Sequence, residues 1–164
     1  MLLLRSLATK PKKICMQLSW TGLKISIAGA KLSHLVQKDS IWDHGSMIEQ
    51  VRTVFIYLKK AYLRGDPSIV KKCTTSEAYK TISDYIKLKK GGAFINTDLK
   101  SIEIIAVCPA KNGHRNKFKA LIKFKNGMEV AEQLSSSYKS SAPSNQEWFF
   151  ECEGNWWLLD KIKS

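Results

Sequence analysis

The chain has 164 residues, of which 44% are hydrophobic and 25% are charged. This composition excludes a disordered polypeptide and leaves room for one domain of ordinary size plus an arm. The 27 Lys and Arg residues outnumber the 14 Asp and Glu residues, which gives a formal net charge of +13. Such a surface favours a polyanionic partner, either nucleic acid or an acidic lipid layer, and charge alone does not choose between them.

The N-terminal region is basic and has no carboxylate before Asp39. Its leucine-rich start is compatible with a mitochondrial-type targeting segment. Its longest uncharged run, residues 14–23, has ten residues, which is about half of what a transmembrane helix needs. We therefore expect residues 1–38 to form a membrane-contacting or targeting arm and residues 40–164 to form the domain. The arm lysines expected to bind anions are Lys10, Lys12, Lys13, Lys24 and Lys31.

Residues 14–36 carry two competing patterns. Leu23 and Ile27 belong to a short alternation typical of a strand. A larger apolar set falls on one helical face instead, and its members are Ile14, Leu18, Ile25, Ala28, Leu32 and Leu35. Two interpretations stay open: a broken amphipathic helix at a membrane interface, or an arm that packs on its own domain.

Three helices are predicted after residue 45. Ser46 and Glu49 form a capping box for a long helix over residues 47–62, which Gly65 ends. Asp66, followed by a proline, opens a short helix that reaches residue 72. A second capping box, Thr74 with Glu77, opens a third helix that closes at residues 91–92.

The remainder predicts an antiparallel meander of four or five strands. Residues 101–107 and 117–125 form the first two, and Asn126 with Gly127 predicts a tight hairpin to a strand over residues 128–134. Residues 147–151 and 156–159 form the last two strands. In each of the pairs Trp148/Phe149 and Trp156/Trp157, we expect one aromatic side chain to lie in the core and the other to point outward. In the strand 117–125 the inward-facing residues are Phe118, Ala120, Ile122 and Phe124. The predicted class is α+β, with three helices packed on a curved antiparallel sheet.

The order of these elements resembles the Tim-forty-four-like domain family, which includes a peripheral subunit of the mitochondrial inner-membrane presequence translocase and its short bacterial and ribosomal relatives. The segments that carry the resemblance are residues 61–66 (AYLRGD), Cys73 with Thr74, Tyr79, residues 102–107, residues 147–150 (EWFF) and residues 157–162 (WLLDKI). The resemblance covers about residues 40–163. Because few residues precede this region, we do not expect the long N-terminal region through which the translocase subunit recruits the import chaperone.

The resemblance implies a cone of the nuclear-transport-factor-two-like kind, in which a curved sheet wraps a helix and leaves an apolar pocket. It also implies attachment to an inner membrane, on the mitochondrial matrix face or on the cytoplasmic face of a bacterium. The residues expected to line such a pocket are Phe55, Tyr62, Tyr79, Phe94, Phe124 and Trp148.

Catalytic chemistry finds little support in the sequence. His34, His44 and His114 lie outside the predicted core faces, and Asp84 and Asp98 have no evident second carboxylate. The four cysteines show no short paired spacing, and there is no glycine-rich phosphate loop or nucleophile elbow. We expect no catalytic residues, metal or cofactor.

The strand 117–125 presents a lysine face: Lys117, Lys119, Lys123 and Lys125. Further cations are expected to flank it in loops, namely Lys87, Lys89, Lys90, Lys111 and Arg115. A strand face on which every charge is positive favours an anionic partner over a surface that is only solvated. We see no aromatic residue among these lysines, which disfavours stacking on single-stranded nucleic acid. Phosphates of structured RNA and of lipid headgroups both remain possible partners.

These features together predict a non-enzymatic, peripheral inner-membrane adaptor of the protein-translocation class, which binds anionic lipid and a protein partner. One alternative is a membrane-associated ribosome- or RNA-binding member of the same fold. A second alternative is a cone that binds a small apolar ligand.

Overall fold

The structure is a computed structural model that describes residues 19–88, 95–111, 114–125 and 145–163. Helices come first along the chain and strands last, which confirms the α+β class. The helical elements are α1 (Trp20–Leu35), the 3-10 helix η1 (Ser40–Trp42), α2 (His44–Arg64), the 3-10 helix η2 (Pro67–Cys73) and α3 (Ser76–Lys87). The strands are β1 (Asp98–Cys108), β2 (Lys117–Lys125), β3 (Asn145–Glu153) and β4 (Trp156–Lys163).

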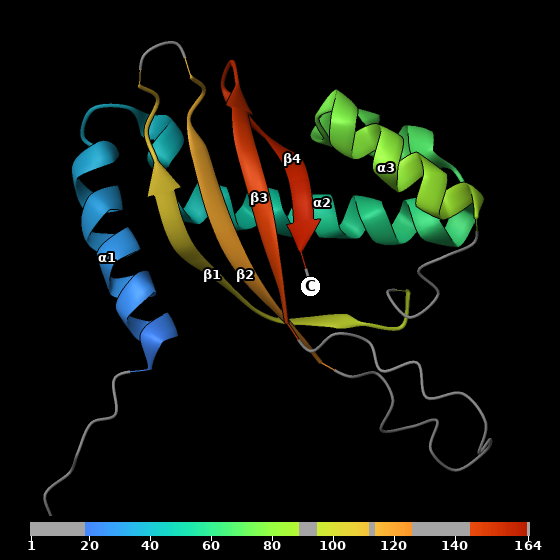
Figure 1. Cartoon of the computed structure of the whole chain (residues 1–164), viewed down its shortest axis with the longest axis horizontal. Coiled ribbons are helices and arrows are strands. Elements are labelled where there is room, and N and C mark those ends of the chain that lie inside the picture. The colour runs from blue at the N-terminus through green and yellow to red at the C-terminus, as the bar shows by residue number, and fades with distance from the viewer. Residues whose placement is uncertain (1–18, 89–94, 112–113, 126–144, 164) are drawn as a thin grey trace, which may run out of the picture.

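The strands form one antiparallel sheet in the order β1-β2-β3-β4. α2 runs across one face of this sheet, while α1 lies beside β1 and α3 lies beyond β4 (Figure 1). We call the face toward α2 the inner face and the opposite face the outer face. The predicted turn at Asn126 and Gly127 and the predicted strand over residues 128–134 lie outside the described residues.

The helix starts differ slightly from the prediction. α2 begins at His44 because Asp43 is its N-cap, and the Asp43 carboxylate accepts a hydrogen bond from the Ser46 backbone N–H at 2.7 Å. The capping box expected at Ser46 was therefore placed three residues too late. The third helix is capped by Thr75, one residue after the expected position, because Thr74 pairs with β4 at Leu159 instead.

The predicted end of the first helix and the predicted start of the second agree with the structure, whereas α3 ends at Lys87, before the predicted close at residues 91–92. Gly65 closes α2 with a φ of 65°, in the left-handed region that a residue without a Cβ adopts at least cost. Asp66 then caps η2 by accepting a hydrogen bond from the Ser68 backbone N–H at 2.9 Å.

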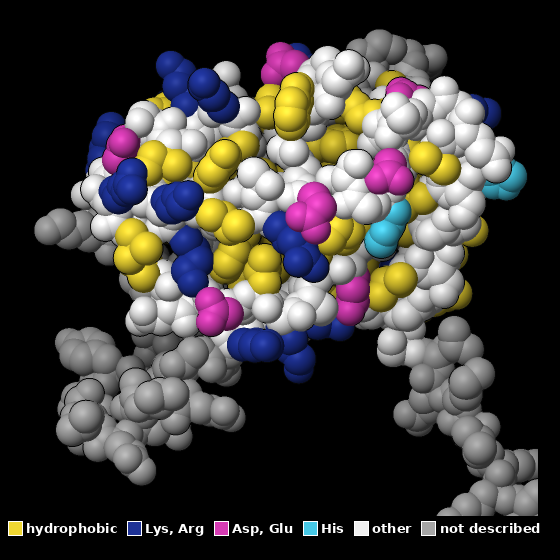
Figure 2. All heavy atoms as spheres, turned by 180° about the vertical axis from the view of Figure 1, so that it is seen from behind, with side chains coloured by type: hydrophobic (Ala, Val, Ile, Leu, Met, Phe, Trp, Pro, Cys, Tyr) yellow, Lys and Arg dark blue, Asp and Glu magenta, His cyan; other side chains and the backbone are white. Residues whose placement is uncertain are grey.

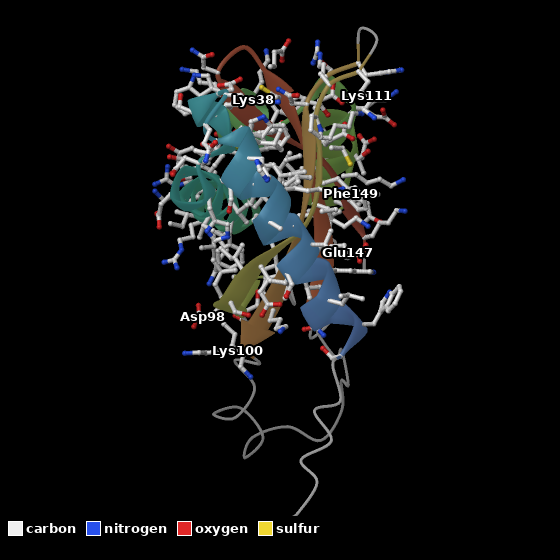
Figure 3. All side chains as sticks on the ribbon, turned by 90° about the vertical axis from the view of Figure 1, so that its left-hand side faces the viewer. Lys38, Asp98, Lys100, Lys111, Glu147 and Phe149 are labelled. Carbon is white, nitrogen blue, oxygen red and sulfur yellow. The ribbon has the colours of Figure 1, made fainter. Side chains whose placement is uncertain are left out.

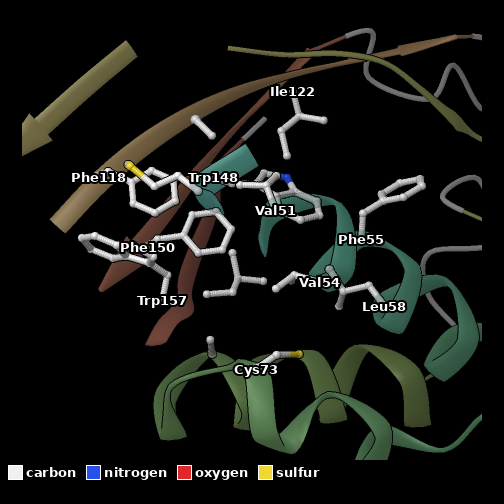
Figure 4. Packing of buried hydrophobic residues seen from close by; sticks show 14 of the residues in the cluster. Val51, Val54, Phe55, Leu58, Cys73, Phe118, Ile122, Trp148, Phe150 and Trp157 are labelled. Carbon is white, nitrogen blue, oxygen red and sulfur yellow. The ribbon is translucent and has the colours of Figure 1, made fainter. Parts of the chain in front are cut away.

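An aromatic cluster occupies the core between α2 and the inner face (Figure 4). Phe118 of β2 stacks on Phe150 of β3 with ring centroids 4.6 Å apart, and Trp157 of β4 meets Phe118 edge-on at 4.8 Å. Phe118, Ile122 and Phe124 are all buried, so the predicted inward face of this strand is confirmed. Trp42 of η1 completes the cluster by packing against Trp157 at 5.1 Å.

The two aromatic pairs divide between the faces as predicted. Trp148 and Trp157 are buried in the core. Their neighbours point away from it: Phe149 is half-buried on the outer face, and Trp156 is 65% exposed near the turn between β3 and β4.

Residues 20–35 form a single helix that packs on its own domain. Ala28 and Leu32 are buried on the side of α1 that faces β1, and Ile25 and Leu35 flank them. Of the two interpretations of residues 14–36, the contacts of α1 match the second. The one-face pattern of Ile25, Ala28, Leu32 and Leu35 is confirmed, whereas Ile14 and Leu18 lie outside the described residues.

Phe150 and Phe149 offer a matched test of this architecture, because they are neighbours on opposite faces of β3. We expect Phe150→Ala to lower the free energy of unfolding by about 3–5 kcal/mol, since it empties a fully buried ring site. Phe149→Ala should cost less than half as much. Urea unfolding followed by fluorescence measures both, and equal losses would contradict the assignment of the faces.

Candidate functional site

The lysines of β2 lie on the outer face, and three of them pair with carboxylates on neighbouring strands. Lys117 meets Glu151 at 2.9 Å and Lys119 meets Glu147 at 3.0 Å, both on β3. Lys123 meets Glu103 of β1 at 2.8 Å. Three of the four lysines of this face are therefore neutralised within the sheet, which leaves these three side chains less able to hold an external anion.

The ion pairs follow from the register. Lys117 lies directly opposite Glu151, while Lys119 and Lys123 each reach a glutamate two residues along the neighbouring strand. The hydrogen bond from Lys117 to Glu151 raises the pKa of the lysine, with the negative charge of Glu151 adding to the effect. Raising this pKa keeps the ammonium group charged.

An aromatic ring lies among these cations, contrary to the prediction from the strand alone. The Lys119 ammonium lies 4.6 Å from the centroid of the Phe149 ring, and the Lys163 ammonium lies 5.2 Å from it. Phe149 and Glu147 point to the same side of the sheet (Figure 3). Phe149 and Glu147 belong to β3, and the register of β2 with β3 places them beside the β2 lysines. The sequence of β2 alone therefore could not show that an aromatic ring lies there.

The flanking cations do not extend one continuous lysine surface. Arg115 reaches Glu151 at 3.3 Å and Glu153 at 3.5 Å. Lys111 is exposed beyond β1, and Lys87 is exposed at the end of α3. Lys125 is exposed at the end of β2. The other predicted positions, Lys10, Lys12, Lys13, Lys89 and Lys90, lie outside the described residues.

A second apolar stripe runs along the free side of α1. Trp20 is 73% exposed and Ile27 is 49% exposed, with Leu23 partly exposed between them. Spacings of three and four residues place the three side chains on one helical face. Lys24 and Lys31 are exposed next to this stripe.

We define the α1 stripe as Trp20, Leu23, Lys24, Ile27 and Lys31. α1 contains no carboxylate, so no acidic side chain on this helix opposes the two lysines. Sequence reasoning missed the α1 stripe because it treated Leu23 and Ile27 as exceptions to one apolar face. The sequence did contain a signal for it, because Leu23 and Ile27 are four residues apart and therefore share one helical face.

Three of the expected pocket residues pack against one another. The Phe55 ring lies 5.9 Å from that of Phe124 and 6.5 Å from that of Trp148, so these side chains occupy the space between α2 and the sheet. Tyr62 and Tyr79 are half-buried beside the same core, and burial raises the pKa of Tyr62. Phe94 lies outside the described residues.

A shallow hollow lies between η1, the start of α2 and the turn between β3 and β4. Its one carboxylate, Asp39, caps η1 by accepting a hydrogen bond from the Ile41 backbone N–H at 3.0 Å. Its amide groups include Gln50, which donates to the Trp157 carbonyl at 3.2 Å. The lining residues are Asp39, Ser40, Ile41, Ser46, Gln50, Asn155, Trp156 and Trp157.

The other titratable groups do not converge. His34, His44 and His114 are all exposed, and burial raises the pKa of the Cys73 thiol to about 11, which disfavours a reactive thiolate. Asp98 pairs with Lys59 at 3.2 Å. Among the described residues, no group of three His, Cys, Asp or Glu side chains is placed to hold a metal ion.

None of the described helices combines the length and the apolar character that crossing a bilayer requires. Comparison of the sequence with profiles of known protein families and with curated proteins gives no match.

The paired lysines lead to a stability prediction that distinguishes Lys123 from Lys125. Glu103 is half-buried. One of its oxygens is bound by Lys123, and its other oxygen is buried with no hydrogen-bond partner among the described residues. Lys123→Ala should therefore cost about 1–3 kcal/mol of unfolding free energy, because it leaves this carboxylate uncompensated.

The matched control is Lys125→Ala, which removes the same charge from the exposed end of the same strand. It should change the unfolding free energy by less than about 0.5 kcal/mol. Urea unfolding of both variants at low salt tests the pair. An equal effect of the two substitutions would show that the contact between Lys123 and Glu103 contributes nothing to the fold.

Proposed function

We propose that the protein is a non-enzymatic peripheral membrane adaptor that binds an anionic bilayer surface through the α1 stripe. The observation that carries this proposal is that α1 is apolar on two sides. One side packs on β1, and the other exposes a tryptophan, a leucine and an isoleucine beside two lysines. A helix that is hydrophobic all round normally has both sides covered, so the free side of α1 favours an apolar environment outside the domain.

A bilayer surface fits the composition of this stripe. Trp20 has an amphipathic ring of the kind that settles at headgroup depth, and Leu23 and Ile27 reach the boundary with the acyl chains. Lys24 and Lys31 have long stems that leave their ammonium groups among the lipid phosphates. Each lysine near an anionic surface contributes about 1 kcal/mol of binding free energy.

The α1 stripe is a better membrane contact than the lysines of β2. Lys117, Lys119 and Lys123 already neutralise carboxylates, and an approaching phosphate would have to compete with Glu151, Glu147 and Glu103. In the α1 stripe, Lys24 and Lys31 have no carboxylate on their own helix that would compete with a lipid phosphate. The proposal thus keeps the predicted anionic lipid and the predicted arm lysines Lys24 and Lys31, and it leaves out the lysines of β2.

The wider class follows from the resemblance of residues 40–163 to the Tim-forty-four-like family. We propose a cone of the nuclear-transport-factor-two-like kind, a protein partner of the translocation class, and a location on an inner membrane. The placement of α2 across the apolar face of the sheet supports such a cone. Phe55, Phe124 and Trp148 contact one another where a small ligand would lie, which favours an adaptor over a ligand carrier.

The test is vesicle binding by a variant of the stripe. Lys24→Ala/Lys31→Ala should weaken binding to phosphatidylglycerol-containing vesicles by roughly thirtyfold, since two lysines at about 1 kcal/mol each are lost. The helix should persist because both positions are exposed and alanine is the best helix former. Co-sedimentation and circular dichroism measure the two properties.

Two controls separate the α1 stripe from bulk charge. Lys80→Ala/Lys87→Ala removes the same charge from α3 and should bind vesicles almost as the wild type does. Trp20→Ala should weaken binding with no change in charge. If the α1 variants bind normally and Lys119→Glu/Lys123→Glu does not, the membrane contact is on the sheet. If the wild type co-sediments with ribosomes and Lys119→Glu/Lys123→Glu does not, the RNA alternative is favoured instead.

A further inference from the structure

The hollow between η1, the start of α2 and the turn between β3 and β4 has not entered the proposed function. We call it the η1 hollow, and its volume is about 280 Å³. That volume is at the small end of the range for ligand pockets, so it suits a small head group better than a drug-sized molecule.

The buried wall of the η1 hollow is fixed by contacts between distant parts of the chain. Trp157 is 4% exposed, and its indole N–H donates to the Ile41 carbonyl at 3.0 Å. Gln50 of α2 donates to the Trp157 carbonyl at 3.2 Å, and the Trp42 ring packs edge-on against that of Trp157. The hollow is therefore formed without a ligand, which lowers the entropy lost when a ligand binds.

The outer wall of the η1 hollow is open to solvent. Trp156 is 65% exposed, and Asn155 and Ser40 are exposed beside it. Asp39 accepts a hydrogen bond from the Ile41 backbone N–H through Oδ1 at 3.0 Å, while its Oδ2 accepts none from the described residues. A ligand in the hollow would therefore meet an aromatic ring and a carboxylate oxygen that can still interact.

The segments that form the η1 hollow are acidic, although the chain as a whole is strongly basic. Residues 39–51 contain three carboxylates and residues 153–160 contain two, and neither segment contains any of the 27 Lys and Arg residues. Asp39 is the only ionisable side chain in the lining. From behind, Lys and Arg are sparse toward the right of the surface, the side on which α2 begins (Figure 2).

We propose that the η1 hollow binds a small organic cation with a methylated ammonium group, such as choline. Such a group donates no hydrogen bonds and is held by aromatic rings and a nearby negative charge. Trp156 and Trp157 supply the rings, and Asp39 supplies the charge. Because Oδ1 of Asp39 already accepts a hydrogen bond, a cation that needs no acceptor in a fixed position fits better than a guanidinium group, which needs several.

The same arrangement disfavours an anion, which would meet the Asp39 carboxylate at close range. The η1 hollow and the α1 stripe therefore select groups of opposite charge, and they share no residue. The cation could be a free choline compound or the head group of a choline lipid, since both present the same chemistry.

The probe is choline chloride, and isothermal titration calorimetry of the full chain measures its binding. Asp39→Asn should weaken that binding by about tenfold, because it removes the only charge in the lining. Asparagine caps helices as well as aspartate does, so η1 should persist. Trp156→Ala should also weaken binding by about tenfold, and the fold should tolerate this change because Trp156 is largely exposed.

The matched control is Asp43→Asn, which removes the same charge four residues along the chain. The Asp43 carboxylate caps α2 through the Ser46 backbone N–H and does not line the hollow, so this variant should bind choline as the wild type does. A second control is the neutral isostere of choline, in which carbon replaces the nitrogen. It should bind at least tenfold more weakly than choline.

Vesicles of phosphatidylcholine alone separate the two sources of the cation. Co-sedimentation of the wild type but not of Trp156→Ala identifies the lipid head group, whereas no co-sedimentation identifies a soluble choline compound. The proposal is overturned if choline does not bind, if Asp39→Asn binds it as the wild type does, or if the neutral isostere binds equally well. Lys24→Ala/Lys31→Ala should leave choline binding unchanged, so the test does not depend on whether α1 contacts lipid.

Discussion

The stacking of Phe118 on Phe150 is the contact on which the rest of the sheet depends. The two residues are partners in the register of β2 and β3 and lie 4.6 Å apart on the inner face. A one-residue slip would turn every side chain of β2 to the opposite face and put lysines against α2. The same register places Lys117 opposite Glu151 on the outer face. Aromatic packing on one side therefore determines which charges meet on the other.

That coupling explains why the net charge of +13 does not appear as one basic sheet surface. The sheet pairs Lys117, Lys119 and Lys123 internally, so much of the excess charge lies on the helices, where carboxylates are few. On α1 no carboxylate is present, and on the last turns of α2 none follows Glu49. Lysines among exposed apolar side chains differ from lysines on a solvated strand, because the apolar contact adds free energy that salt does not screen.

The fold was largely predictable because local signals agreed with one another. Alternation in β2, the turn at Gly65 and the split of Trp156 from Trp157 each follow from residues close in sequence. The paired lysines were not predictable in this way, since Glu103 lies 20 residues from Lys123 in the chain and only the register joins them. The prediction for α1 missed its exposed apolar side for another reason. Its second apolar stripe contradicts the one-face pattern of a surface helix, and Leu23 and Ile27 were instead assigned to a strand-like alternation.

The exposed apolar side of α1 leaves Trp20, Leu23 and Ile27 in contact with water unless something outside the domain covers them. α1 presents Trp20 and lysines with no carboxylate on its own helix, which suits a fluid layer of phosphates that requires no fixed geometry.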